Sequence, residues 1–170
     1  MPFAIRPGTP EDVEAVESVR ITTWKSAYRG IMPDGYLDAL TVDPGIVAQR
    51  REGLTAALAE GRTPLFVGEL DGRVVGFVNL GRSRDQDIPG GEIFAIYVLP
   101  EAQSLGLGLA LMNAAVDRLR ADGHTEFGLW VATDNAPSRH FYERFGLKPS
   151  GRVAAHDEPV VEETHYRMSL

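Results

Sequence analysis

The sequence contains no cysteine among its 170 residues. This absence excludes disulfide bonds, thiolate nucleophiles and cysteine-based metal sites, although it does not identify a cellular compartment. Long apolar runs are absent too, so we expect no transmembrane segment and no membrane partner. The N-terminal segment turns acidic without the apolar core of a secretory signal, and we therefore expect a cytoplasmic protein.

Basic residues are fewer than acidic ones, with 17 Lys and Arg against 24 Asp and Glu and a formal net charge of −7. A nucleic-acid partner would require a basic face, so we expect none. The negative charge fits a cationic small substrate, although a charged surface also serves solubility. The histidines lack the helical spacing with an intervening glutamate that a zinc hydrolase needs, and we expect no metal site.

The remaining composition is that of an ordinary globular protein, with 44% hydrophobic and 24% charged residues. A chain of this length can bury a substantial core. No internal repeat, low-complexity tract or linker interrupts it, so we expect one domain over residues 1–170.

Apolar spacing and turn residues predict alternating helices and strands along the chain. Apolar residues recur at helical spacing between capping residues in five segments, namely residues 10–28, 36–40, 44–60, 106–122 and 136–145. A hairpin is expected around Asp71-Gly72, a strong two-residue turn signal. Further strands are expected at residues 3–6, 92–99, 126–132, 147–155 and 162–170.

The fold class follows from the connections between these elements. The strand at 92–99, the helix at 106–122 and the strand at 126–132 have the length of a crossover, which joins parallel strands. The other connections are mostly antiparallel hairpins. We therefore expect an α+β fold, with a mixed, mostly antiparallel twisted sheet of about seven strands, a central parallel pair, and about four flanking helices.

Two glycines stand at the first turn of the clearest helix. Gly106 and Gly108 each weaken a helix by about 1 kcal/mol relative to alanine. At a helix N-terminus the absence of Cβ atoms would let an anion such as phosphate reach unpaired backbone N–H groups. A loop-to-helix transition that needs an unusual φ would explain the glycines equally well, so both interpretations stay open.

The two common phosphate-binding motifs do not fit this turn. A dinucleotide fingerprint requires a third glycine where the sequence has Leu111, and a glycine closer to the preceding strand. An NTPase phosphate loop requires Gly-Lys-Ser/Thr, which is absent. A nicotinamide or flavin redox protein is therefore disfavoured.

Two separate motifs resemble those of one protein family. Residues 103–108, QSLGLG, match the Gln/Arg-x-x-Gly-x-Gly/Ala signature of the GNAT superfamily of acyl-CoA-dependent N-acetyltransferases. Asn135-Ala136 followed by FYERFGL at 141–147 resembles that family's Asn…Phe-Tyr-x-x-x-Gly-Phe segment, with Leu147 in place of phenylalanine. The opening IRPGTPEDVEAV and the closing HYRMSL are similar as well, so the resemblance covers almost the whole chain.

The resemblance implies acetyl-CoA as co-substrate and a splayed pair of parallel strands, 92–99 and 126–132, that holds its pantetheine arm. The diphosphate would lie on the turn and on the N-terminus of the following helix. Asn135 would contact the arm, although it fits a simple helix N-cap equally well. The residues that the resemblance assigns to the coenzyme are Tyr97, Val98, Gln103, Ser104, Leu105, Gly106, Leu107, Gly108, Leu109, Ala110 and Asn135.

Two residues are candidates for the proton transfers that the implied reaction requires. The acceptor amine must lose a proton, and the departing thiolate must be stabilised or protonated. Tyr142 matches the family's thiolate-protonating tyrosine, and its alternative role is helix packing beside Phe141. Glu92, at the start of a strand bordering the acyl site, is the candidate base, and its alternative is a solvated strand end.

The acceptor site implied by the family would involve Trp24, Tyr28, Arg29 and Phe94. The two aromatics of the first helix fit a core stripe as well. The predicted function is transfer of the acetyl group to a primary amine of a small molecule or protein, by direct attack in a ternary complex. Transfer of another short acyl group and a non-catalytic acyl-CoA-binding module are the alternatives, and homodimer formation stays open.

Overall fold

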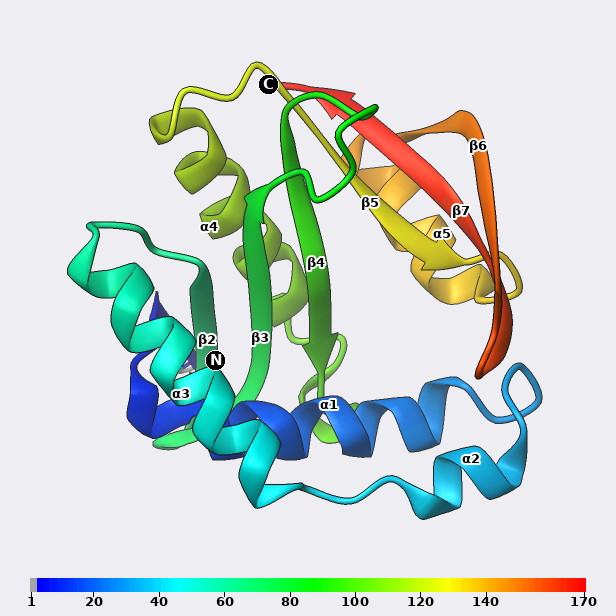
Figure 1. The fold of residues 1–170 in the computed structure, drawn as a ribbon, viewed down its shortest axis with the longest axis horizontal. Helices are drawn as coiled ribbons and strands as arrows, with labels where there is room; N and C mark the ends of the chain where they lie inside the picture. The colour runs from blue at the N-terminus through cyan, green and yellow to red at the C-terminus, as the bar shows by residue number, and fades with distance from the viewer. Residues whose placement is uncertain (1–2) are drawn as a thin grey trace.

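Seven strands form one mixed sheet in the computed structural model, which describes residues 3–170 (Figure 1). The strands are β1 Phe3–Pro7, β2 Leu65–Leu70, β3 Arg73–Arg82, β4 Gly91–Val98, β5 Glu126–Ala132, β6 Lys148–Asp157 and β7 Val160–Ser169. Their order across the sheet is β1-β2-β3-β4-β5-β7-β6. β4 and β5 are parallel, and the other neighbouring strands are antiparallel. The predicted fold class is confirmed.

Five α-helices accompany the sheet, one more than the approximate number expected. They are α1 Val13–Ala27, α2 Asp34–Ala39, α3 Pro44–Ala59, α4 Leu107–Ala121 and α5 Ala136–Phe145. Short 3₁₀ turns precede α1 at Pro10–Asp12 and α4 at Pro100–Ala102. Within residues 3–170, no helix combines the length and apolarity that crossing a bilayer would require.

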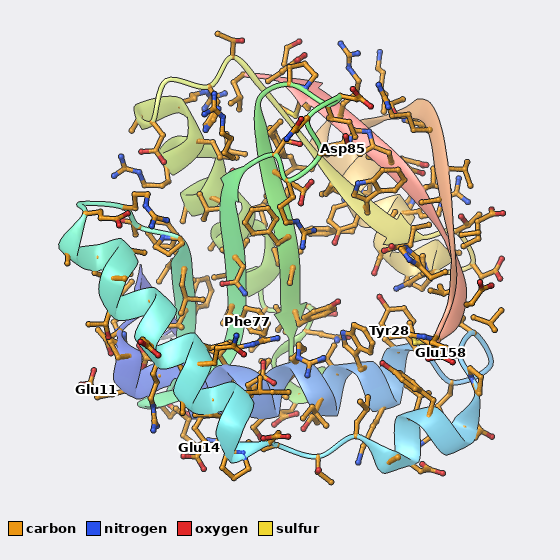
Figure 2. The ribbon with its side chains drawn as sticks, viewed as in Figure 1. Glu11, Glu14, Tyr28, Phe77, Asp85 and Glu158 are labelled. Carbon is orange, nitrogen blue, oxygen red and sulfur yellow. The ribbon has the colours of Figure 1, made fainter. Side chains whose placement is uncertain are left out.

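The helices cover both faces of the sheet (Figure 1). On one face, α4 and α5 close a core whose fully buried members include Leu107, Leu111 and Phe127. On the other face, α1 and α3 pack on β2 and β3 around Val67 and Phe77, the second of which is labelled in Figure 2. Burial of such side chains contributes about 1.5–3 kcal/mol each, so the sheet is held from both sides.

The start of α1 is tied to the sheet edge by one carboxylate. Asp12 accepts hydrogen bonds from both terminal nitrogens of Arg6 in β1, at 2.7 and 2.8 Å. It also accepts from the backbone N–H of Thr9, at 2.8 Å, which satisfies an amide at the helix entrance. The Arg6 guanidinium lowers the pKa of Asp12. These bonds fix where α1 begins its path across β3 and β4.

β4 and β5 pair over three positions and then separate. The register runs Gly91 to Phe127, Glu92 to Gly128 and Ile93 to Leu129. On its other edge β4 carries a bulge, because Asn79 faces Ala95 while Leu80 faces Ile93, which leaves Phe94 as the extra residue. The bulge lies where the pairing with β5 ends, and Figure 1 shows the two strands diverging from there. The predicted splay is confirmed.

The turn before α4 explains one of its two glycines directly. Gly106 is the N-cap of α4 with φ +85°, and Ser104 also has a positive φ of +66°. A Cβ at Gly106 would meet nothing within 4 Å, so this glycine satisfies both the backbone requirement and open access. Gly108 has no positive φ, and a Cβ there would lie in ordinary contact with the Phe141 ring at 3.7 Å.

Alanine at these two glycines should have opposite effects on stability. Gly106→Ala forces an L-residue into the left-handed region and should lower the free energy of unfolding by about 1 kcal/mol. Gly108→Ala improves helix propensity without strain and should raise it by about 0.5–1 kcal/mol. Denaturant unfolding followed by circular dichroism measures both changes. Equal effects of the two variants would contradict the assigned backbone roles.

Candidate active site

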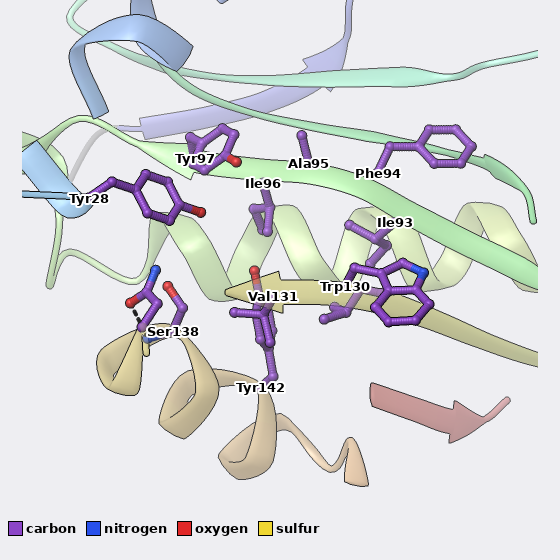
Figure 3. Close-up of a pocket in the computed structure, with 12 residues that line it drawn as sticks. Tyr28, Ile93, Phe94, Ala95, Ile96, Tyr97, Trp130, Val131, Ser138 and Tyr142 are labelled. Carbon is purple, nitrogen blue, oxygen red and sulfur yellow. Dashed lines mark hydrogen bonds between the residues drawn. The ribbon is translucent and has the colours of Figure 1, made fainter. Parts of the chain in front are cut away.

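A narrow cavity of about 40 Å³ lies where β4 and β5 diverge (Figure 3). We call this cavity the slot. Its walls come from both strands, from the end of α1 and from α5. The lining residues are Tyr28, Ile93, Phe94, Ala95, Ile96, Tyr97, Leu129, Trp130, Val131, Asn135, Ser138 and Tyr142.

Within residues 3–170, the strand edges along the slot have no partner strand. Beyond Ile93 and Leu129, β4 bonds only to β3, and β5 bonds only to β7. Backbone groups left unpaired at a strand edge attract another extended chain that carries N–H and C=O groups. The slot can therefore hold an elongated ligand with amide groups as a strand would be held.

The β4–α4 turn presents a row of backbone amides at the end of the slot nearest Val98. Within the described chain, no backbone carbonyl accepts from the N–H groups of residues 104–109, and the first bond of this kind runs from Ala110 to Gly106 at 3.0 Å. The side chain of Gln103 donates to the carbonyl of Val98 at 3.0 Å, which holds the turn against β4. Free amides at a helix N-terminus suit a phosphate-type anion.

Tyr142 projects from α5 into the space between the two strands (Figure 3). Its side chain is 8% exposed, and burial raises the pKa of its phenol, with a smaller contribution from Tyr28. The phenol is therefore protonated across the neutral range. A protonated O–H in a buried cavity is suited to donate to a developing anion.

Two more tyrosines stand at the same cavity. Tyr28, 7% exposed at the end of α1, and Tyr97 of β4 both line the slot. Burial raises the pKa of each, and for Tyr97 the rise is large. Asn135 also lines the slot, and its side chain accepts from the backbone N–H of Ser138 at 3.3 Å. The helix-capping interpretation of Asn135 is therefore present in the structure.

A larger cavity, of about 550 Å³, lies on the other side of β4. We call it the groove, and its walls are α1, α3, β3 and β4. Phe94, Ala95 and Tyr97 line both cavities, so the bulged part of β4 is their common wall. The other lining residues are Val13, Val16, Arg20, Trp24, Arg50, Gly53, Leu54, Ala57, Arg62, Pro64, Leu65, Asn79, Leu80 and Arg84.

The arrangement of a split parallel pair, an amide-rich turn and a buried tyrosine agrees with the comparison to family models. The model of the acetyltransferase (GNAT) family matches residues 24–147, which is most of the chain. The chain belongs to the GNAT acetyltransferase family. The family and enzyme class predicted from the sequence are thereby confirmed.

Relatives and solved structures agree with this assignment. The acetyltransferase is 29% identical to the uncharacterized N-acetyltransferase YuaI of Bacillus subtilis, over 83% of this chain and 78% of that protein. It is 28% identical to the probable N-acetyltransferase Rv2775 of Mycobacterium tuberculosis, over 88% of this chain and 82% of that protein. Its fold resembles the PaiA N-acetyltransferase of Thermoplasma acidophilum, solved with coenzyme A, with TM-score 0.79, 20% identity and full coverage of both chains.

The predicted acceptor residues of this acetyltransferase separate into three places. Trp24 lies in the groove, Tyr28 lies in the slot, and Phe94 borders both. Trp24 contacts Tyr28 edge-on, with ring centroids 5.2 Å apart, so it is also part of the aromatic packing expected from the helix stripe. Arg29 lies at neither cavity and pairs on the surface with Asp34 and Asp38.

Glu92, the candidate base of the acetyltransferase, is buried and paired. Its side chain is 4% exposed and accepts from Nε of Arg84 at 2.7 Å. The Arg84 guanidinium also stacks over Phe94, 4.5 Å from the ring centroid. Glu92 lines neither cavity, although both of its neighbours in this cluster line the groove. The alternative interpretation, that Glu92 is a solvent-exposed residue at a strand end, is therefore wrong. Its role as the base stays a prediction.

Several residues at the acetyltransferase cavities were not found by sequence reasoning. Trp130 and Ser138 line the slot, and four arginines line the groove. Gly53, in the middle of α3, was the one local signal, because a glycine inside a helix has a cost of about 1 kcal/mol that calls for an explanation. Among residues 3–170, no cluster of three or more His, Asp or Glu side chains is placed to hold a metal ion.

Proposed function

We propose that residues 1–170 act as one N-acetyltransferase domain that moves the acetyl group of acetyl-CoA to a primary amine. The observations that support this most directly are the slot between β4 and β5 and the free amides of the β4–α4 turn, which follows the last residue of β4, Val98. A pantetheine arm carries amides that can pair with the strand edges. Its diphosphate would then accept from the turn, with Gly106 leaving the approach open.

The reaction in this proposal takes place at the common wall of slot and groove. An amine in the groove attacks the thioester carbon, a C–N bond forms, and the C–S bond breaks as the intermediate collapses. The thiolate takes the proton of the Tyr142 phenol, which burial keeps in place until that step. The chain has no cysteine to carry the acyl group, which favours direct attack in a ternary complex.

The base in this proposal is Glu92, acting through water. The carboxylate of Glu92 is paired with Arg84, and Arg84 lines the groove. A proton that leaves an amine in the groove therefore has a short route to Glu92. Arg84 pairs with the carboxylate and would need to turn away to let water approach. Because Arg84 is two-thirds exposed, with 67% of its side chain accessible, that movement meets little packing resistance.

Coenzyme binding should be weakened by a side chain at the β4–α4 turn, and not by replacement of any glycine that has a positive φ. Gly106→Val places a branched side chain over the free amides and should weaken coenzyme A binding at least about tenfold in calorimetry, which corresponds to about 1.4 kcal/mol. Gly123→Val is the matched control, because Gly123 follows the other end of α4 with φ +91° and equally open space. A folded Gly106→Val protein that binds as tightly as the control would refute the proposed diphosphate site.

Tyr142→Phe should lower kcat by about 10²-fold with little change in coenzyme affinity, because the phenol acts on the departing thiolate. The buried ring is retained, so packing changes little. Release of free thiol from acetyl-CoA with a panel of amines gives the rate. No amine-dependent thiol release in the wild-type protein, together with tight coenzyme binding, would instead show a non-catalytic acyl-CoA-binding module.

Glu92→Gln tests the base separately from the acid. Loss of the carboxylate should lower kcat about tenfold or more, because no side chain is then left to take the amine proton. Arg84→Gln serves as the comparison, because it removes the partner and leaves the carboxylate. A Glu92→Gln enzyme with an unchanged kcat would assign proton removal to solvent alone.

A further inference from the structure

The groove is lined by basic residues in an acidic protein. Arg20, Arg50, Arg62 and Arg84 border it, and its described lining contains no aspartate, glutamate or lysine. The chain as a whole has a net charge of −7. Three glutamates pair with the four guanidiniums, namely Glu17, Glu60 and Glu92, so the set keeps one net positive charge. A cationic substrate therefore meets the wrong sign in this cavity.

Glu17 organises two of these arginines. Its carboxylate, with 2% of the side chain exposed, accepts from Arg20 at 3.1 and 3.2 Å and also from Arg50. A buried carboxylate must be paired, so it draws one guanidinium from α1 and one from α3 to the same place. Nη1 of Arg20, and Nε and Nη2 of Arg50, make no hydrogen bond to any other described residue. Donors are thus left over at the groove.

Gly53 adds space beside these donors. It lies on α3 three residues after Arg50, has no positive φ, and a Cβ built on it would meet nothing within 4 Å. Neither backbone conformation nor close packing within the chain requires a glycine there. Its effect is to widen the groove at a cost in helix stability of about 1 kcal/mol.

An aromatic path connects the arginine pair with the reaction site. The Arg20 guanidinium lies over Trp24, 5.4 Å from the ring centroid. Trp24 in turn contacts Tyr97, with ring centroids 6.4 Å apart, and Tyr97 belongs to the common wall of groove and slot. A small molecule held at the arginines can therefore extend along Trp24 to β4.

We propose that the acceptor is a small amine that also carries a carboxylate or phosphate group, with the anion bound by Arg50 and Arg20 and the amine directed to the common wall. The proposal rests on the proposed acetyltransferase function and refines it. Guanidinium groups match both anions through paired N–H donors. The groove volume of about 550 Å³ suits a ligand of this size. The cationic substrate suggested by the net charge is replaced by an anionic or zwitterionic one.

The test compares amines that differ only in the anion. L-leucine is compared with L-leucinamide, and O-phosphoethanolamine with ethanolamine, while spermidine serves as the cationic amine. The readout is kcat/KM for thiol release, corrected for the fraction of neutral amine. We expect the anionic member of at least one pair to be favoured about tenfold or more, because a neutral analogue leaves the arginine donors unpaired. The favoured pair identifies the anion.

Arg50→Gln should abolish that preference, raising KM for the anionic amine about tenfold and leaving the neutral analogue unaffected. Arg51→Gln is the matched control, because Arg51 is adjacent on α3 but turns away to the carbonyl of Pro10 and to Glu14. It should keep the full preference. Coenzyme A affinity should be the same in all three proteins, which excludes a folding defect.

The outcomes separate the two proposals. Acetylation of amines regardless of charge, a preference for spermidine, or an unchanged preference in Arg50→Gln overturns the anion site and leaves the acetyltransferase proposal standing. If no amine is acetylated, the proposed function fails. Calorimetric titration of the coenzyme-bound protein with L-leucine and O-phosphoethanolamine then tests anion binding in the groove by itself. If neither compound binds, the proposed anion site is refuted.

Discussion

The separation of β4 from β5 is the constraint on which the rest of the site depends. Three residue pairs join the strands, and the bulge at Phe94 lies where that pairing ends. A sheet that stayed closed would satisfy its own backbone groups and leave no slot. The same bulge places Phe94 and Ala95 at the groove as well as at the slot. The bulged segment of β4 thus separates a cavity on each side of the strand and forms the wall that the two share.

The polarity of the two cavities is set by nearby groups and not by the net charge of the chain. The free amides of residues 104–109 form a neutral but strongly donating end to the slot. Beside the groove, the buried carboxylate of Glu17 holds Arg20 and Arg50 together, although their like charges repel each other. Both features direct donors at the cavities of a chain with net charge −7. A ligand approaching the cavities meets this local field first, because surface charges farther than about 10 Å are screened by salt.

Burial keeps the three tyrosines of the slot protonated before any reaction begins. Tyr28, Tyr97 and Tyr142 all have raised pKa values, chiefly because their phenols are removed from water. Three neutral O–H groups around a cavity can orient and donate without introducing charge. Glu92 pairs instead with Arg84, which stacks over Phe94 and lines the groove. The structure therefore places neutral donors around the slot and a carboxylate–guanidinium pair beside the groove.

The sequence by itself determined the secondary structure, the parallel crossover and the amide-rich turn, because these depend on local spacing, capping residues and loop length. The position of Gly106 at the start of α4 could be predicted from neighbouring residues alone, and Tyr142 was identified through its motif. Only the tertiary structure decided that Glu92 is buried against Arg84, that Arg29 pairs away from the site, and that Arg20 and Arg50 converge on Glu17. These groups come from separate elements, because Arg20 and Arg50 stand on α1 and α3 while Arg84 lies in the loop between β3 and β4. Their relative positions are set by how these elements pack, which no local pattern of residues specifies.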